Sequence, residues 1–342
     1  MKRLFPLFVL SFIISSCFGS VYDDIRINID RASKVKTRLS ELCSKVEIIP
    51  VDDSVLDGSL LRELMLMDVT KDYVFLLTRD KDEIEVFDNL GNYINSLKAT
   101  QVIIDFSTYK DIYLDVLDGN RIVEYDLTDF SLKNTFIIPE TELELISLTK
   151  RDNNVFLLSA VSKGKAYYCY YTIDLTGLYI KDHFYYSESN YTGEDDYRNS
   201  RFFRCNGYSY SYFSKTGVIT IYTDDDFIFR IFEWDWGEYA SSISFSNVQK
   251  TTDNLYMRFN VGYEERTLIY NTDYRRYKII RQTKEGVSFP VGIIHEGINY
   301  YCTPSSELHK YLNPKVKGVE IVGNIEGIGT EDSLVLIKYY LK

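Results

Sequence analysis

Short runs of apolar residues recur along most of the chain, and polar turns separate them. Residues 73–77 lead through a charged turn to residues 84–88, and residues 112–115 lead through a Gly/Asn turn to residues 121–126. Apolar and polar positions alternate within such runs, which is the period of a β-strand, and the turns have the composition of hairpin turns. The pattern predicts a chain built from consecutive β-hairpins.

The second run of several hairpins ends in an Asp or Asn directly before a tight turn. These residues stand 36 to 61 positions apart and are Asp88, Asp126, Asp174, Asp235 and Asn271. Units of this size are typical of propeller blades. We therefore predict an all-β fold, a six-bladed β-propeller of four-stranded antiparallel blades. A two-sheet sandwich is the structural alternative, but its strands would not repeat one turn signature at blade-sized intervals.

The segment before the first blade has its own pattern. Ile25, Ile27 and Ile29 alternate with polar residues, which predicts a short strand. Apolar residues spaced three and four apart then predict a short helix; they are Leu39, Leu42, Cys43 and Val46. A propeller normally closes by sharing strands between its first and last blades. We therefore expect residues 47–51 to pair within the last blade.

The longest interval between two of these turn residues runs from Asp174 to Asp235. It includes residues 188–206, which are rich in Ser, Asn, Gly and acidic residues. This composition is typical of loops rather than strands. We expect an inserted loop there.

The amino end has the features of an export signal. Lys2 and Arg3 precede an apolar run at residues 4–14, which ends at Ser15-Ser16-Cys17. Such a run is too short to cross a bilayer, for which a helix needs about 20 residues. The four residues that end in Cys17 resemble the bacterial lipobox, in which the cysteine is lipidated and becomes the first residue.

The expected organisation follows from this signal. It is a signal peptide at residues 1–16, a lipid-anchored N-terminal segment at residues 17–45 and the propeller at residues 46–342. The expected location is the cell envelope, with the outer membrane favoured. The sequence leaves open whether the protein faces the periplasm or the cell surface. The membrane is then a partner through the N-terminal lipid.

Charge and cysteines restrict the partners further. The chain has 39 Lys and Arg against 50 Asp and Glu, a net charge of −11, so a phosphate backbone is repelled and nucleic acid is not expected as a partner. The remaining cysteines are far apart and allow three pairings; they are Cys43, Cys169, Cys205 and Cys302. We expect most of them to be small buried apolar residues, and the sequence leaves disulfide pairing open.

Several segments carry a resemblance to known proteins. Residues 112–126 resemble an NHL-type propeller repeat. The lipobox, residues 39–50, the turn at residues 86–91 and the ending at residues 331–336 together resemble the six-bladed β-propeller lipoproteins of Gram-negative bacteria. That family is largely without assigned function, so the resemblance implies a fold and not a reaction. Residues 96–101 replace a Gly-rich segment that many members carry.

Linear motifs for chemistry are missing from the sequence. His183, His295 and His309 have no zinc-binding spacing, and neither a nucleophile elbow nor a phosphate-binding loop occurs. The acidic runs at residues 194–196 and 224–226 lack the spacing of a calcium loop. We expect no cofactor and no metal ligands, although a Ca²⁺ ion on the axis would leave no linear motif.

Aromatic residues are abundant, with 30 Tyr and 20 Phe. The strand period places Tyr208, Tyr210 and Tyr212 on one face, and likewise Trp234 and Trp236. Such faces suit sugar rings or peptide side chains, but they also pack well between blades. These five residues are the candidate ligand-binding residues, and Cys17 is the candidate lipidation site.

The function expected from these features is a non-enzymatic envelope lipoprotein. Its propeller would be a scaffold that binds an unknown ligand or protein, with a glycan or a peptide as the class of ligand. The alternative is a metal-dependent hydrolase of the propeller lactonase type, which places a metal ion on the axis. Convergence of three or more ligand side chains on the axis would distinguish the two.

Overall fold

The chain is all-β in the part that the structure describes. The structure is a computed structural model. It describes residues 21–30, 36–52, 64–78, 83–138, 143–152, 155–162, 167–174, 179–187, 201–205, 208–212, 219–222, 228–323 and 333–342. Within these ranges the chain forms β-strands joined by turns and by short 3-10 helices. The prediction of an all-β fold is therefore confirmed.

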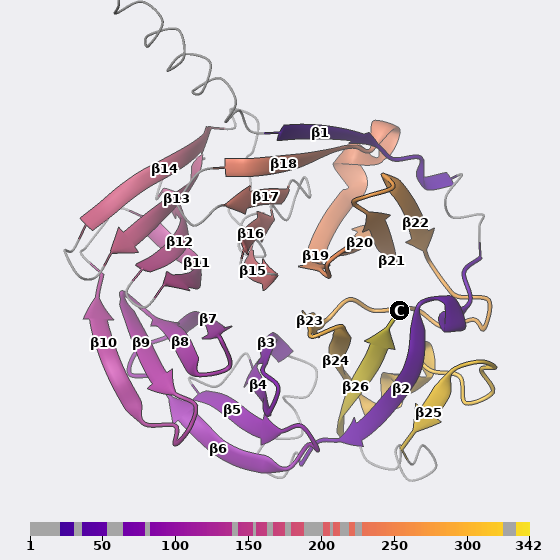
Figure 1. Cartoon of the computed structure of the whole chain (residues 1–342), viewed down its shortest axis with the longest axis horizontal. Helices are drawn as coiled ribbons and strands as arrows, with labels where there is room; N and C mark the ends of the chain where they lie inside the picture. Colours follow the sequence, from indigo (N-terminus) through magenta and orange to yellow (C-terminus); the bar gives the residue numbers. More distant parts are fainter. Residues whose placement is uncertain are drawn as a thin grey trace, which may run out of the picture.

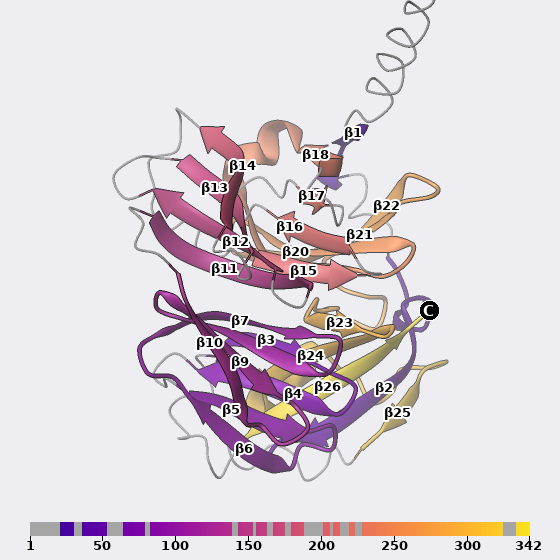
Figure 2. The same cartoon turned by 60° about the vertical axis from the view of Figure 1, so that its left-hand side comes forward.

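The described strands form six sheets arranged round a central axis (Figure 1). Four of these sheets are four-stranded and antiparallel. The first two contain β3 (Leu64–Val69), β4 (Tyr73–Thr78), β5 (Glu83–Asp88) and β6 (Tyr93–Lys98), then β7 (Ile103–Tyr109), β8 (Tyr113–Asp118), β9 (Arg121–Asp126) and β10 (Leu132–Ile137). The next two contain β11 (Leu143–Asp152), β12 (Val155–Ser162), β13 (Tyr167–Asp174) and β14 (Tyr179–Ser187), then β19 (Ile243–Lys250), β20 (Asn254–Val261), β21 (Glu264–Asn271) and β22 (Arg276–Ile280). Figure 2 brings the sheets of β7–β10 and β11–β14 forward, one above the other.

The other two sheets have five strands, because each includes a strand from the amino-terminal part of the chain. One contains β15 (Arg201–Cys205), β16 (Tyr208–Tyr212), β17 (Ile219–Tyr222), β18 (Ile228–Asp235) and β1 (Val21–Arg26). The other contains β23 (Ile293–His295), β24 (Ile298–Pro304), β26 (Leu334–Leu341), β2 (Cys43–Pro50) and β25 (Glu320–Val322). β1 runs parallel to β18, and β2 runs parallel to β25 but antiparallel to β26.

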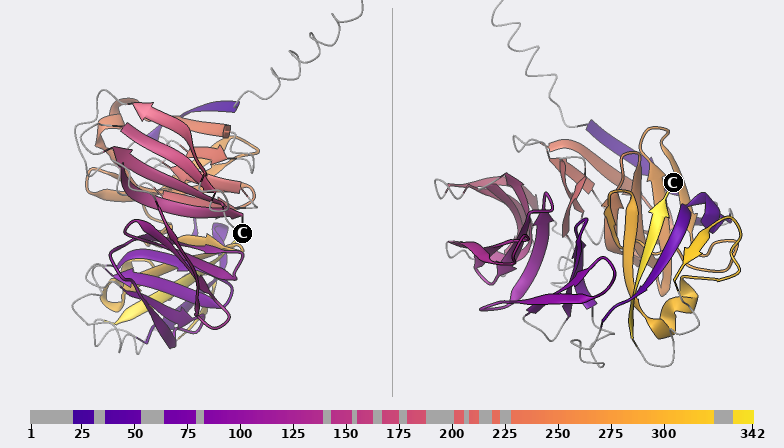
Figure 3. Two further views of the ribbon diagram at one scale, coloured as in Figure 1. Left: turned by 90° about the vertical axis from the view of Figure 1, so that its left-hand side faces the viewer. Right: turned by 60° about the horizontal axis from the view of Figure 1, so that its bottom comes forward.

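These two sheets correct the prediction of uniformly four-stranded antiparallel blades behind a separate N-terminal segment. An outermost strand exposes one edge of unpaired backbone groups, and β1 covers that edge of β18 at the rim of the ring (Figure 3). The pairing expected for residues 47–51 is confirmed, since Glu47 pairs with Lys338 and Pro50 with Val335. β2, from the amino-terminal part of the chain, and β26, the last strand, therefore lie side by side in one sheet.

In each sheet one edge strand lies nearest the axis. These innermost strands contact one another in the order β3, β7, β11, β15, β19 and β23, and β23 contacts β3 in turn. The contacts therefore pass completely round the axis (Figure 1). This arrangement of small antiparallel sheets is a β-propeller.

Three local predictions are corrected by the tertiary structure. The helical spacing around Leu39 yields only a 3-10 helix at Leu39–Glu41, because Cys43 already begins β2 and its side chain is buried against the sheet. Asp235 ends the fourth strand from the axis in its sheet, whereas the other turn residues, Asp88, Asp126, Asp174 and Asn271, end third strands. The segment expected as an inserted loop contains β15, and residues 188–200 of it lie outside the described residues.

The apolar core lies between neighbouring sheets. For example, Phe75 and Ile84 of the first sheet pack with Phe106 and Leu114 of the second in one buried cluster. Every sheet in a ring has a neighbour on each side, so both of its faces bury apolar side chains. This packing accounts for strands that are apolar at successive positions, such as residues 334–339 of β26.

Side chains on the innermost strands bind the backbone of the next sheet. The Thr108 N–H of β7 donates to the Asp68 carboxylate of β3 at 2.6 Å. One sheet further on, the Leu148 N–H and the Ser147 hydroxyl of β11 donate to the Asp105 carboxylate of β7 at 3.0 and 2.5 Å. These hydrogen bonds satisfy donors on strand edges that have no strand partner.

The same arrangement continues round the ring. The Phe202 N–H of β15 donates to the Ser147 hydroxyl at 3.2 Å, and the Ile294 N–H of β23 donates to the Gln249 amide oxygen of β19 at 3.3 Å. Four innermost strands also contain a register shift of one residue, at Met65, Ile104, Ile146 and Ser246. A bulge re-aims the side chains that follow it, which places Asp105 and Ser147 towards the next sheet.

We predict that Asp105→Ala lowers the free energy of unfolding by about 2–4 kcal/mol, because the buried Leu148 N–H and Ser147 hydroxyl lose their acceptor. Urea denaturation followed by circular dichroism measures the loss. The control is Asp253→Ala, which removes an exposed carboxylate and should change stability by less than about 0.5 kcal/mol. Equal effects of the two substitutions would contradict a role for Asp105 in joining the sheets.

Candidate functional site

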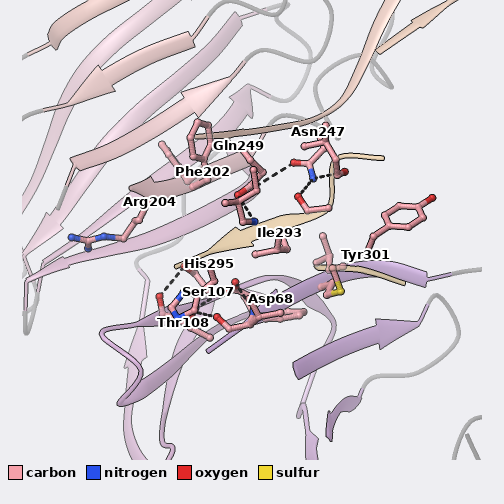
Figure 4. Close-up of a pocket in the computed structure, with 18 of the residues that line it drawn as sticks. Asp68, Ser107, Thr108, Phe202, Arg204, Asn247, Gln249, Ile293, His295 and Tyr301 are labelled. Atoms are coloured by element: carbon pink, nitrogen blue, oxygen red, sulfur yellow. Dashed lines mark hydrogen bonds between the residues drawn. The ribbon is translucent and has the colours of Figure 1, made fainter. Parts of the chain in front are cut away.

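A cavity of about 430 Å³ lies at the axis, where the innermost strands surround it (Figure 4). Most of its wall comes from the innermost strands β3, β7, β15, β19 and β23 and the adjoining turns, and β16, β20 and β24 contribute the rest. Ser107 and Thr108 lie on one side of it, across from Asn247 and Gln249. The volume is within the range of pockets that bind small molecules, about 300–1,000 Å³.

Two carboxylates in the cavity wall already serve the fold. Asp68 accepts hydrogen bonds from the backbone of Thr108 and of Val69, and Asp105 accepts those from β11 described above. Burial raises the pKa of Asp68, and the hydrogen bonds from Thr108 and Val69 act in the opposite direction. These acids therefore hold neighbouring sheets together on the axis.

Two arginines of the wall are likewise held by the protein. Arg258 donates to Glu265 at 2.8 Å through Nε, and its guanidinium lies over the Tyr301 ring at 5.3 Å from the centroid. Arg204 points away from the cavity centre, donates to the Lys150 carbonyl and lies 5.0 Å from the Tyr109 ring centroid. Both arginines line the cavity, and each donates to an acceptor that lies outside the lining.

The mouth of the cavity brings together three potential metal ligands. Asp111 lies in the β7–β8 turn, whereas His295 and Glu296 lie at the β23–β24 turn. One ligand atom from each of these residues lies within 4.8 Å of the other two. The distance from His295 Nε2 to Asp111 Oδ1 is 3.5 Å. The sequence analysis found no metal ligands because these residues come from hairpins far apart in the chain.

A buried charge cluster lies behind the cavity wall, between the sheets of β7–β10 and β11–β14. Lys150 of β11 donates to the Glu124 carboxylate of β9, and its Nζ is 3.6 Å from Asp115 Oδ1 of β8. The rings of Tyr113 and Phe156 enclose the ammonium. Neither Asp115 oxygen has a hydrogen-bond partner in the described part of the chain. Burial raises the pKa of Asp115 to about 7.

The aromatic residues predicted to bind a ligand belong to the core. Tyr210, Trp234 and Trp236 are 3%, 8% and 5% exposed. Tyr210 stacks on Phe203, and the two tryptophans pack on each other and on the neighbouring sheet, where Trp234 contacts Tyr270. Their faces are thus covered by protein, because both faces of a propeller sheet are buried. Of the two uses that the sequence analysis left open for these rings, packing between sheets is the one that the structure describes for Tyr210, Trp234 and Trp236.

Tyr212 is the one described member of that set that lines the cavity. It is 2% exposed, and its hydroxyl donates to the Ser246 carbonyl at 3.4 Å. Tyr208 begins β16, but its side chain lies outside the described residues, and so does Cys17. A cavity contact through Tyr212 therefore stays compatible with the structure, while a three-tyrosine binding face is not shown.

The remaining candidates are placed as follows. Cys43, Cys205 and Cys302 are free thiols, of which Cys43 and Cys302 are buried, as the sequence analysis favoured. His309 is exposed in a 3-10 helix at Ser305–Lys310. The side chains of Cys169 and His183 and the acidic runs at residues 194–196 and 224–226 lie outside the described residues.

No protein-family model and no curated protein sequence matches the chain. Its fold is similar to that of a Bacteroides fragilis protein described as exported, with a TM-score of 0.61, 13% identity, and coverage of 94% of this chain and 100% of that chain. A streptogramin B lyase matches with a TM-score of 0.52, 7% identity, and coverage of 87% and 98%. An inactive histidine-to-alanine form of virginiamycin B lyase from Staphylococcus aureus, solved with quinupristin, matches with 0.50, 10%, and coverage of 86% and 98%.

At these identities the likeness establishes the fold alone. It supports the β-propeller architecture over the full length of the structural neighbours. Among the residues that the structure describes, none of the helices has the length and hydropathy needed to span a bilayer.

We predict that Asp115→Asn changes how stability depends on pH. The pKa of Asp115, raised to about 7 by burial, means that the folded chain keeps a proton that the unfolded chain releases above about pH 4. The wild-type stability attributable to this group therefore falls as the pH rises from about 4 to 7, by up to about 1.4 kcal/mol per pH unit, and Asn does not share this loss.

Urea unfolding of both proteins across that pH range measures the difference. Asp273→Asn replaces an exposed carboxylate and is the control, for which the profile should run parallel to that of the wild type. A parallel profile for Asp115→Asn would show that Asp115 ionises as it does in the unfolded chain.

Proposed function

We propose that this protein is a six-bladed propeller that binds a small polar ligand in its axial cavity without covalent chemistry. The observation that carries the proposal is the cavity of about 430 Å³ bounded by innermost strands from most of the ring. A sugar or a peptide side chain is the class of ligand that its lining suits. We do not propose nucleic acid as a partner, because a net charge of −11 repels a phosphate backbone.

The lining supports a polar ligand for two reasons. Ser107, Thr108 and Gln249 supply hydroxyl and amide groups, while Ile293 and the Tyr301 ring supply apolar surface. A few fixed polar groups within an apolar wall is the usual composition of a small-molecule site. The structural neighbour solved with quinupristin supports the idea that a propeller of this fold accommodates a small molecule.

We further propose that the protein is a lipoprotein of the cell envelope, anchored at Cys17 in the outer membrane. The support is the lipobox-like sequence before Cys17 and the structural likeness to a protein described as exported. β1 begins at Val21, four residues after Cys17, and four residues span at most about 14 Å. A lipid on Cys17 would therefore hold the rim formed by β1 and β18 close to the bilayer surface.

We predict that Ser246→Trp abolishes ligand binding, because Ser246 is an exposed residue of the cavity lining and an indole there would fill the space. The probes are arrays of envelope oligosaccharides and short peptides, applied to the purified chain. Ser244→Trp is the matched control, since Ser244 is exposed on the same strand but does not line the cavity.

The expected result is binding of at least one probe that is lost in Ser246→Trp and retained in Ser244→Trp, with both variants folded by circular dichroism. If the wild type binds no probe on either array, or if the two variants bind equally, the axial binding site is refuted.

We predict that Cys17→Ser abolishes incorporation of labelled palmitate and releases the protein from the membrane fraction of an expressing Gram-negative host, because the thiol is the acceptor of the lipid. Cys205→Ser removes a partly buried thiol of β15 and should leave both properties unchanged. Continued labelling of Cys17→Ser would place the lipid elsewhere or exclude it.

A further inference from the structure

Asp111, His295 and Glu296 place one imidazole and two carboxylates together, and these are groups that bind metal ions in proteins. The separation of 3.5 Å between His295 Nε2 and Asp111 Oδ1 matches the distance of about 3.4 Å between two ligands of one tetrahedral zinc ion, given metal–ligand bonds of about 2.0–2.1 Å. The ligand atom of Glu296 lies within 4.8 Å of both, so a rotation of this exposed side chain completes the set.

His295 Nε2 is the group that the fold leaves unused. This atom is inaccessible to solvent and has no hydrogen-bond partner in the described part of the chain, although it faces the Asp111 carboxylate. Buried polar atoms in proteins are nearly always paired, so an unpaired imidazole nitrogen beside a carboxylate indicates a missing partner. A metal ion accepts the lone pair of the imidazole and the charge of the carboxylate together.

The two turns hold their ligands in an uncommon backbone conformation. Lys110 and Asp111 have φ values of 53° and 55°, and Glu296 has φ 48° before Gly297. Left-handed positions in hairpin turns favour Gly and Asn over Lys and Glu. Ligand atoms of Asp111 and Glu296 lie within 4.8 Å of each other, although β7 and β23 belong to sheets separated by that of β3.

We propose that Asp111, His295 and Glu296 bind a divalent transition-metal ion of the zinc class at the mouth of the axial cavity. The imidazole nitrogen selects zinc and similar ions over Ca²⁺ and Mg²⁺, which prefer oxygen ligands only. Three protein ligands leave a fourth position open, as in zinc sites that bind an exogenous group. Since Asp111 and His295 line the cavity, that position faces the space where a ligand enters.

The competing arrangement is an ion pair of a protonated His295 with Asp111, which needs no metal. It uses the same 3.5 Å approach but gives Glu296 no role, and it opposes zinc binding because the imidazole lone pair is occupied by a proton. Zinc titration of the wild type and of Glu296→Gln therefore separates the two arrangements, because only the metal site uses all three side chains.

The test is calorimetric titration of the metal-free full-length protein in detergent with ZnCl₂, and in parallel with CaCl₂. We expect one zinc ion per chain and no measurable heat from calcium. His295→Ala and Asp111→Asn should each weaken zinc binding at least about tenfold, and Glu296→Gln should weaken it as well. X-ray absorption of the zinc-loaded protein should show nitrogen and oxygen ligands at about 2.0–2.1 Å.

His309→Ala is the matched control, because His309 is exposed beside Glu307 in a 3-10 helix and should leave zinc binding unchanged. Circular dichroism of the metal-free variants establishes that they fold. Absence of zinc binding, unchanged affinity in His295→Ala, or equal binding of calcium would each overturn the proposal. The outcome is independent of ligand binding, since Ser246→Trp leaves all three metal ligands in place.

Discussion

The inner edge of each sheet is the constraint on which this structure depends. Sheets that stand side by side round an axis cannot pair their innermost strands in a ladder, so the backbone donors of those strands need other acceptors. Asp68, Asp105, Ser147 and Gln249 supply them, each reaching to the next sheet in the ring. The polar groups near the axis are therefore structural first, and the spacing they impose leaves a cavity between the strands.

The same constraint separates the groups that hold the fold from those available for function. Asp68 and Asp105 are occupied by backbone donors, and Arg204 and Arg258 are held by contacts beyond the cavity. The turns at the ends of the innermost strands are free of that task. His295 and its two acidic neighbours lie there, at the mouth of a cavity whose walls are already fixed. A site built in this way has rigid walls and chemistry concentrated in two hairpin turns.

Burial on both faces of every sheet explains the high aromatic content. Trp234 and Trp236 pack between the sheet of β15–β18 and that of β19–β22, and Tyr270 meets Trp234 edge to face. The strand period predicted correctly that Trp234 and Trp236 share a side, but in a propeller that side belongs to the neighbouring sheet. Large rings fill the space that widens between sheets away from the axis. Exposed aromatic platforms are therefore not needed to account for the composition.

The sequence by itself determined the strands and the hairpin turns, because these features depend on local period and turn chemistry. The pairing of residues 47–51 in the last sheet followed from the general rule by which a propeller closes, once the repeated units had indicated that fold. Only the tertiary structure decided that β1 joins β18, that Asp235 ends a fourth strand rather than a third, and that Leu39–Glu41 is a single 3-10 turn. It also decided that Asp111 meets His295. Contacts between residues so far apart in the chain follow from closure of the ring, and no pattern within one hairpin records which other hairpin will lie opposite it.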